Sequence, residues 1–189
     1  MTQQGKNAID LVLAESLIEL SAKKPIDKIT IKEITDKAGV IRPTFYNHFQ
    51  DKYELIEWII KTELLEPIKP LLNAGMIFEA IVLMLNNISA NSAFYKKALK
   101  LEGAVTFNQI AMKCVCEMFM NIISEKSTGK KSKYRWLTPE VISTYYAQSL
   151  CFITEGWIAQ GMDDIEPKEM AEAYMYLITR SMDDILSEL

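Results

Sequence analysis

Residues 30–55 have the sequence TIKEITDKAGVIRPTFYNHFQDKYEL, and this stretch decides the fold. Thr30 and Glu33 have the spacing of a capping box, in which a hydroxyl and a carboxylate bind the free amides at a helix start. Gly39 follows two helical turns later, where a glycine can adopt a positive φ and end the helix. Pro43 fits the first turn of a second short helix, because no amide hydrogen is needed there. The stretch therefore predicts two short helices joined by a tight turn.

Two short helices at this spacing form a helix-turn-helix. In that motif the first helix crosses the DNA backbone and the second lies in the major groove, which is about 12 Å wide. Apolar residues at helical spacing predict the face on which the two helices pack. The predicted inward residues are Ile31, Ile34, Ala38, Val40, Phe45 and Phe49, and the predicted outward residues are Arg42, Thr44, Tyr46, Asn47 and His48.

The rest of the chain is also predicted to be helical. Residues 7–22 have an amphipathic pattern, and a further helix is expected to run from Gln50-Asp51 to about residue 66, where Pro67 and Pro70 should break the chain. No window keeps an alternation of period two, so no strand is predicted. Later helices are predicted over 76–89, 92–101, 104–126, 138–160 and 167–187, separated by breaks at Asn91, Gly103, 124–133 and 161–167.

The composition bounds the class of protein. The chain has 189 residues, a formal net charge of −4, one histidine and three cysteines. One histidine and no suitably spaced cysteines predict no metal site and no cofactor, and the absence of phosphate-loop, Gly-x-Ser-x-Gly and His-Glu-x-x-His motifs argues against an enzyme. The charge is uneven, because residues 22–52 carry seven bases and four acids, which leaves −7 on the remainder.

Localisation is predicted from the thiols and from hydropathy. An odd number of cysteines fits the reducing cytosol, and the N-terminal residues have no apolar stretch of signal-peptide type. Residues 76–85 are the most apolar segment, and they are much shorter than the roughly 20 residues needed to span a bilayer. We therefore expect a cytoplasmic protein that has no membrane partner.

Residues 30–55 closely resemble the N-terminal DNA-binding motif of the TetR family of bacterial transcription regulators. The matching positions are Ala38-Gly39-Val40, Thr44-Phe45-Tyr46, Phe49, Lys52 and Leu55. Two later stretches, 94–99 and 156–162, are similar to the subgroup that contains the dihydroxyacetone kinase operon activator. The resemblance implies an all-α protein with a three-helix DNA-binding domain at 1–52 and a helical regulatory and dimerisation domain at 53–189.

The resemblance also implies which residues contact DNA. Arg42, Pro43 and Thr44 would open the recognition helix and face the bases, since an arginine pairs bidentately with guanine and a threonine contacts the thymine methyl. The family usually has a small or hydroxyl residue where this chain has Ile41, and the loss of a capping oxygen costs about 1 kcal/mol. The remaining predicted contacts are Thr30 and Asn47, with Tyr46, His48 and Lys52 on phosphates.

The second domain is expected to bind a small effector and a second copy. Residues that could line an apolar effector pocket, or could equally fill a core, are Phe107, Met112, Phe119, Tyr145, Phe152 and Glu155. Apolar stripes on the last two helices predict a four-helix dimer interface through Leu150, Thr154, Trp157, Tyr174, Leu177, Ile178 and Ile185. A homodimer would offer two recognition helices to a pseudo-palindromic operator.

Several alternatives stay open from the sequence. The basic segment 124–135 is either a linker, which is favoured, or a second DNA contact, and the acids between 163 and 184 are either solvated helix ends or a cation site. A protein co-activator could replace the small effector. The sequence does not distinguish a repressor from an activator, and a small all-α enzyme is the remaining competitor.

Overall fold

The computed structural model describes residues 3–102, 105–126 and 133–188, and within these ranges the chain is helical with no strand. The predicted all-α class is therefore confirmed. The predicted break at Gly103 and the centre of the predicted 124–135 linker lie outside the described residues. The helices are α1 (Gln3–Ser21), η1 (Ile26–Lys28), α2 (Ile31–Ala38), α3 (Arg42–His48), α4 (Lys52–Ile59), η2 (Ile60–Leu65), α5 (Glu66–Asn73), α6 (Ile77–Ala90), α7 (Ser92–Ala98), α8 (Phe107–Lys126), α9 (Pro139–Ala159), α10 (Pro167–Thr179) and α11 (Met182–Glu188).

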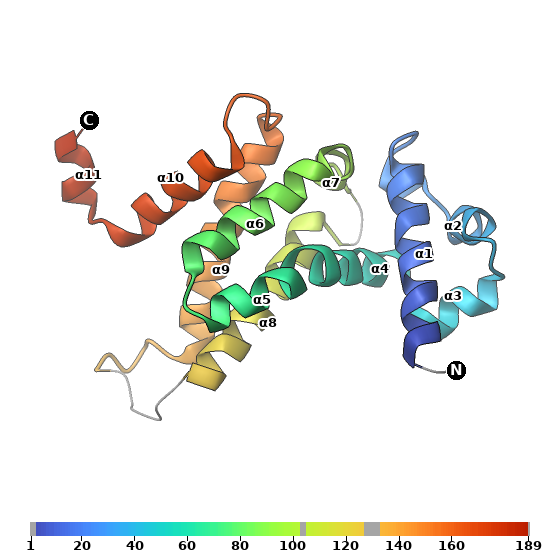
Figure 1. Cartoon of the computed structure of the whole chain (residues 1–189), viewed down its shortest axis with the longest axis horizontal. Helices are drawn as coiled ribbons and strands as arrows, with labels where there is room; N and C mark the ends of the chain where they lie inside the picture. The colour runs from blue at the N-terminus through green and yellow to red at the C-terminus, as the bar shows by residue number, and fades with distance from the viewer. Residues whose placement is uncertain (1–2, 103–104, 127–132, 189) are drawn as a thin grey trace.

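Helices α1 to α3 form a small unit at one end of an elongated molecule, and α11 lies at the other end (Figure 1). Helix α1 contacts α2, α3 and α4, so one layer of apolar side chains holds all four together. The inward residues Ile34 and Phe45 are fully buried and Phe49 is nearly so. Burial of this layer fixes α3 against α2 and leaves the opposite face of α3 in solvent.

The turn between α2 and α3 forms as the sequence predicts. The Thr30 hydroxyl accepts a hydrogen bond from the Glu33 amide at 3.3 Å, and the Glu33 carboxylate accepts one from the Thr30 amide at 2.9 Å. Gly39 ends the helix with φ +69°, which a side chain would disfavour. Local signals alone therefore define both ends of α2.

The predicted break at Pro67 and Pro70 is wrong. The helix continues from α4 through the π-helical segment η2 into α5, which contains both prolines and ends at Asn73. A proline at position 67 cannot donate to the Glu63 carbonyl one helical turn earlier. The Asn87 side chain from α6 donates to that carbonyl instead, at 3.0 Å. A distant amide thus satisfies the acceptor that the proline leaves free.

The second part of the chain is a bundle around α8 and α9, which pack along each other, with α6 packed between α5 and α10 (Figure 1). Helix α7 continues only to Ala98, so the predicted helix 92–101 is too long. The predicted helix 167–187 is also wrong, because the chain is extended at Arg180 and restarts as α11. Ser181 and Asp184 form reciprocal capping bonds at that restart.

The length and hydropathy of the helices bear on a membrane-spanning role. Within the described ranges no single helix is long and apolar enough to span a membrane, and α6 with α7 meets the length and composition limits only as a pair bent by 88°. The three cysteines are free, with Cys114 and Cys151 buried. No group of three or more potential metal ligands occurs among the described side chains.

Candidate functional site

The outward face of α3 is the first candidate site. Arg42, Pro43 and Asn47 are exposed, and Tyr46 keeps half of its surface in solvent. The Arg42 guanidinium donates to the Tyr46 hydroxyl at 3.0 Å and lies 5.7 Å from the centre of its ring. This contact holds the Arg42 side chain along the helix, because Tyr46 lies one turn after it. Two planar groups are thus presented side by side, and both can hydrogen-bond to DNA.

The start of α3 has no side-chain cap. Ile41 stands at the N-cap position, is 68% exposed, and accepts the Thr44 amide only with its backbone carbonyl, at 2.9 Å. Pro43 removes one of the amides that would otherwise need a partner, which lessens the cost. The expected loss of a capping oxygen is therefore confirmed.

Replacing Ile41 with serine is expected to raise the free energy of unfolding by about 0.5 to 1 kcal/mol, because the hydroxyl can accept the Thr44 amide. Little apolar burial is lost, since the isoleucine is largely exposed. Chemical denaturation measures the change, and Ile41→Ala is the matched control that removes the same side chain without adding an oxygen. Equal stability of the serine and alanine variants would contradict this account of the cap.

The predicted outward orientation of His48 is wrong. Its side chain is only 2% exposed, and Nδ1 lies 2.6 Å from Oδ1 of Asp10 on α1, which is 8% exposed. A buried carboxylate needs a partner, and the imidazole supplies it. His48 therefore ties the end of α3 to α1, and it does not contact phosphate from this position.

The predicted phosphate contact of Lys52 also needs correction. Its ammonium donates to three backbone carbonyls, those of Ile26 at 3.0 Å, Asp27 at 2.7 Å and Ile29 at 3.2 Å. These carbonyls lie in and just after η1, so the lysine closes the end of that short helix. Burial lowers the pKa of the ammonium. All three of its N–H groups are used within the chain, which leaves none directed at DNA.

Thr30 lies at the exposed start of α2, where its hydroxyl serves the capping box. The same hydroxyl donates to the Glu33 carboxylate at 2.8 Å, and Lys24 approaches that carboxylate at 2.5 Å. The hydrogen bonds from Lys24 and Thr30 lower the pKa of Glu33 to about 2. Thr30 is exposed, so its hydroxyl stays accessible from solvent.

The basic side chains of residues 22–52 are largely paired within the chain. Lys28 approaches Asp27 at 3.3 Å, Lys32 approaches Asp36 at 2.9 Å, and Lys37 contacts Glu19. Such exposed pairs are weak, so phosphate oxygens can replace the carboxylates at small cost.

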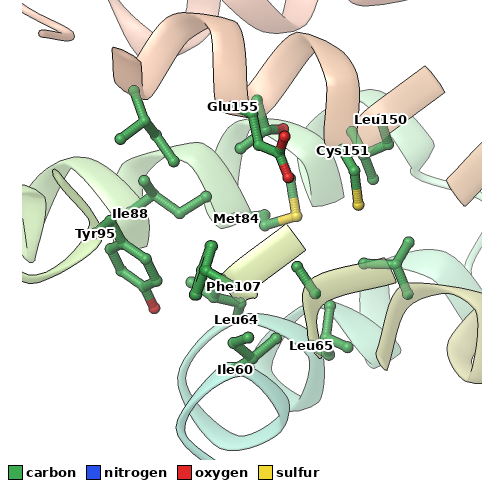
Figure 2. Close-up of a pocket in the computed structure, with 14 residues that line it drawn as sticks. Ile60, Leu64, Leu65, Met84, Ile88, Tyr95, Phe107, Leu150, Cys151 and Glu155 are labelled. Carbon is green, nitrogen blue, oxygen red and sulfur yellow. The ribbon is translucent and has the colours of Figure 1, made fainter. Parts of the chain in front are cut away.

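The second candidate site is a cavity beneath η2 with a volume of about 40 Å³. Figure 2 shows that Ile60, Leu64 and Leu65 of η2 line one side, while Leu150, Cys151 and Glu155 of α9 line the other. The remaining wall is apolar and comes from α6, α7 and α8. The segment that continues α4 therefore forms part of the cavity wall.

Polar groups at this cavity are few. The Glu155 carboxylate accepts a hydrogen bond from the Asn108 side chain, and burial raises the pKa of Glu155. Burial also raises the pKa of the Cys151 thiol to about 12, so the thiol stays protonated. Within the described residues the buried hydroxyls of Tyr95 and Thr154, two further lining residues, have no hydrogen-bond partner.

The predicted pocket residues divide between the interior and the surface. Phe107 and Glu155 line the cavity, and Met112 and Phe119 pack against the core from partly buried positions. Tyr145 and Phe152 are 62% and 76% exposed, so their assignment to an internal pocket is wrong. Both belong to the outer face of α9.

Several residues predicted to form the dimer interface are instead buried within one chain. Leu150, Trp157 and Tyr174 are at most 5% exposed inside a single chain, so they are not available to a partner. The Trp157 indole donates to the Ile165 carbonyl at 2.9 Å, and Tyr174 shares a hydrogen bond with Ser149. Thr154 lines the cavity, and Ile178 and Ile185 are half-buried. Leu177 is the member of the set that is exposed, at 47%.

Two family models match the chain. One, described as "Bacterial regulatory proteins, tetR family", matches residues 15–59. The other, described as "Transcriptional regulator C-terminal region", matches residues 76–180, more than half of the chain. The chain belongs to the TetR family. Both models describe regulators, so this TetR-family chain is a transcriptional regulator.

Named relatives agree with this assignment. The chain is 26% identical over 152 residues, 79% of each chain, to the HTH-type dhaKLM operon transcriptional activator DhaS of Lactococcus lactis subsp. lactis (strain IL1403). A solved structure of the dihydroxyacetone kinase operon activator DhaS matches with TM-score 0.63 and 21% identity, covering 90% of this chain and 93% of that chain. NalD, the secondary repressor of the MexAB-OprM multidrug efflux pump in Pseudomonas aeruginosa, matches with TM-score 0.59 and 12% identity over 92% and 96%. The structural matches show that these TetR-family proteins share one fold.

A network of charged side chains joins the two parts of this TetR-family regulator. Glu57 on α4 binds Lys61 of η2 at 2.7 Å and Lys113 of α8 at 2.8 Å. Lys61 also binds Glu117 of α8 at 2.7 Å. Burial opposes the charge of Lys61, but the two carboxylates outweigh it and raise the pKa of the ammonium. Helix α4, which follows the unit formed by α1 to α3, is thereby fixed to the wall of the cavity.

Proposed function

We propose that this regulator is a homodimer that binds a pseudo-palindromic operator by placing one α3 helix in each of two major grooves. The observation that carries the proposal is the division of α3 into two faces. Phe45 and His48 hold one face against the neighbouring helices, while Arg42, Tyr46 and Asn47 leave the other face open. A helix fixed in this way can present side chains to base edges with little loss of conformational entropy.

The exposed apolar side chains of α9 and α10 support the dimer. Tyr145, Phe152 and Leu177 expose 62%, 76% and 47% of their surfaces, which is unusual for large apolar groups on two adjacent helices. We infer that these three residues, and not the buried stripe beside them, meet a second copy. A twofold arrangement of the two helices gives a four-helix interface.

The experiment that tests the proposal is selection of binding sites from random duplex DNA by the full chain, with sedimentation equilibrium of the same preparation. We expect enriched sites with two inverted half-sites whose centres are about one helical turn, or a multiple of it, apart. We also expect a dimer that Phe152→Glu weakens. Recovery of unrelated sequences, or of single half-sites bound by a monomer, would contradict the proposal.

We further propose that a small molecule bound in the cavity controls operator affinity. The cavity lies between η2 and α9, so a ligand there can favour one position of α4 over another. Only a difference in ligand affinity between the two positions can shift the equilibrium, and coupling of about 1 to 3 kcal/mol would change operator affinity roughly 5- to 150-fold.

Ala111 lines the cavity, and its replacement by leucine is expected to abolish ligand binding by filling the space. A panel of small uncharged compounds can be tested by the rise in thermal midpoint that each one gives. A cavity ligand should stabilise the wild type but not Ala111→Leu, and it should stabilise the control Ala90→Leu, which adds the same side chain on the exposed end of α6. Equal stabilisation of all three proteins would place the ligand elsewhere.

The cavity volume also favours a second candidate, which is an activator controlled by a protein co-activator. About 40 Å³ is far smaller than the roughly 300 to 1,000 Å³ of typical ligand pockets, so a small-molecule effector requires the cavity to open. The relative DhaS is named as an operon activator. A slower complex in a gel-shift assay, when a candidate partner protein is added to regulator and DNA, would identify this mode of control.

A further inference from the structure

The apolar face of helix α11 is open to solvent in the part of the chain that the structure describes. None of its residues is buried, and Met182 and Leu186 expose 72% and 61% of their surfaces. Ile185 lies on the same face, since residues three and four apart are neighbours on a helix. Isolated helices of seven residues are not stable in water, because nucleation costs more than so few hydrogen bonds return. This short helix therefore needs an apolar surface to pack against.

The chain offers such a surface at the start of α9. A groove of about 740 Å³ runs past Trp136, Leu137, Val141 and Tyr145, and we refer to it as the Trp136 groove. Trp136 is 74% exposed and Tyr145 is 62% exposed. The aromatic rings give the groove a large apolar floor that is covered by nothing in the chain as described.

The charges of the two surfaces are opposite. Helix α11 carries three acids and no base. Lys133 and Arg135 are exposed directly before the Trp136 groove, and from 133 to 148 they are opposed by Glu140 alone. An apolar strip with acidic flanks thus matches an aromatic groove with basic flanks, and charges of this kind set the orientation of docking.

The two surfaces do not meet within one chain. Figure 1 shows α11 and the segment before α9 well apart, both at the end of the molecule away from the helix-turn-helix. Helix α11 is held to its own chain through α10, where Arg180 binds Glu188 at 3.1 Å and Tyr176 donates to the same carboxylate. These contacts use the face opposite Met182 and Leu186, which stays open.

We infer that α11 of each copy docks in the Trp136 groove of the other copy, so that the dimer is closed by a reciprocal exchange of C-terminal helices. The inference rests on the proposed dimer and extends it, because the groove continues the exposed face of α9 that carries Tyr145 and Phe152. The exchange links the end of each chain to the partner's α9, which forms one wall of the effector cavity.

The test compares Leu186→Glu with Ser187→Glu in the 189-residue chain. Both add one negative charge to exposed positions of α11, but residue 187 is on the face opposite Met182. Loss of one buried leucine contact is expected to raise the dimer dissociation constant about 10- to 100-fold for Leu186→Glu, while Ser187→Glu changes it less than about threefold. Sedimentation equilibrium measures both constants.

Trp136 fluorescence gives a second measurement. The difference spectrum between wild type and Trp136→Phe isolates this indole from Trp58 and Trp157. Trp136 emission should shift to shorter wavelength as the dimer forms. Leu186→Glu should abolish this shift at concentrations where the variant is still dimeric. A shift that is already complete in the dilute monomer would place α11 on its own chain and overturn the exchange.

Different results would overturn the proposed dimer and the exchange of α11. A chain that sediments as a monomer at every concentration overturns the proposed dimer and the exchange together. A dimer that Phe152→Glu weakens, but that Leu186→Glu and Ser187→Glu leave equally tight with unchanged Trp136 emission, overturns the exchange alone.

Discussion

Arg42→Ala is expected to weaken binding of the dimer to its selected operator by about 30- to 20,000-fold, because each subunit loses about 1 to 3 kcal/mol of base-specific contact. Arg42 is exposed at the start of α3 and is oriented by its hydrogen bond to the Tyr46 hydroxyl. Its guanidinium can therefore meet a guanine edge in the major groove without rearrangement of the helix. Fluorescence anisotropy with labelled duplexes measures the loss.

Specificity is the informative part of that measurement. Affinity for random DNA should fall much less than affinity for the operator, and the preference at one base pair of each half-site should relax. Tyr46→Phe is the companion variant, since it removes the hydroxyl that accepts the arginine and keeps the ring beneath it. Equal losses on operator and random DNA for Arg42→Ala would mean that the arginine contacts only phosphate.

Lys52→Met is expected to lower the free energy of unfolding by about 2 to 4 kcal/mol, since three carbonyls at the end of η1 lose a charged donor. The methionine keeps most of the aliphatic stem, so the change reports on the ammonium. Chemical denaturation measures the stability. Lys32→Met is the matched control, because Lys32 makes only an exposed pair with Asp36, and its replacement should cost less than about 0.5 kcal/mol.

The salt dependence of operator binding separates this role from a phosphate contact. At a temperature where the variant stays folded, Lys52→Met should leave the slope of log K against log salt unchanged. A phosphate contact from each subunit would flatten the slope by about 2. A flatter slope with unchanged stability would restore Lys52 to the DNA surface and refute its role in closing η1.

The sequence was sufficient to predict the ends of helices where the interactions that define them are local. Thr30, Glu33, Gly39 and Pro43 lie within 14 residues of one another, and they define the helix-turn-helix through caps that need no distant partner. The break before α11 belongs to the same class. Its Ser181-x-x-Asp184 capping signature is present in the sequence and would have predicted the restart.

The errors at the candidate DNA surface arise from distant partners. His48 pairs with Asp10, 38 residues earlier, and Lys52 binds carbonyls 23 to 26 residues earlier. Neither contact leaves a trace in the spacing of residue types. The same holds for the helix that passes Pro67, where the compensating amide comes from Asn87 on α6.

The wrong assignment of the inner and outer faces of α9 has another cause. The helix is apolar around most of its circumference, so periodicity shows two stripes and does not tell which one is inside. Trp157 and Leu150 are buried, and Tyr145 and Phe152 are exposed. Tyrosine at position 145 gave a weak signal for the outer face, since its hydroxyl has no need of a buried partner there.

Helix α3 is proposed to enter the major groove of each half-site, and affinity cleavage gives the sharpest test of that position. A metal chelate that cuts DNA would be attached to Asn47→Cys, an exposed position on α3, in a chain in which the half-buried Cys116 is changed to serine. We expect two zones of cleavage, one within each half-site and centred on the major groove, about one helical turn or a multiple of it apart. Cleavage that is absent, or no different from that of a chelate placed at Ser187→Cys on α11, would contradict the proposal.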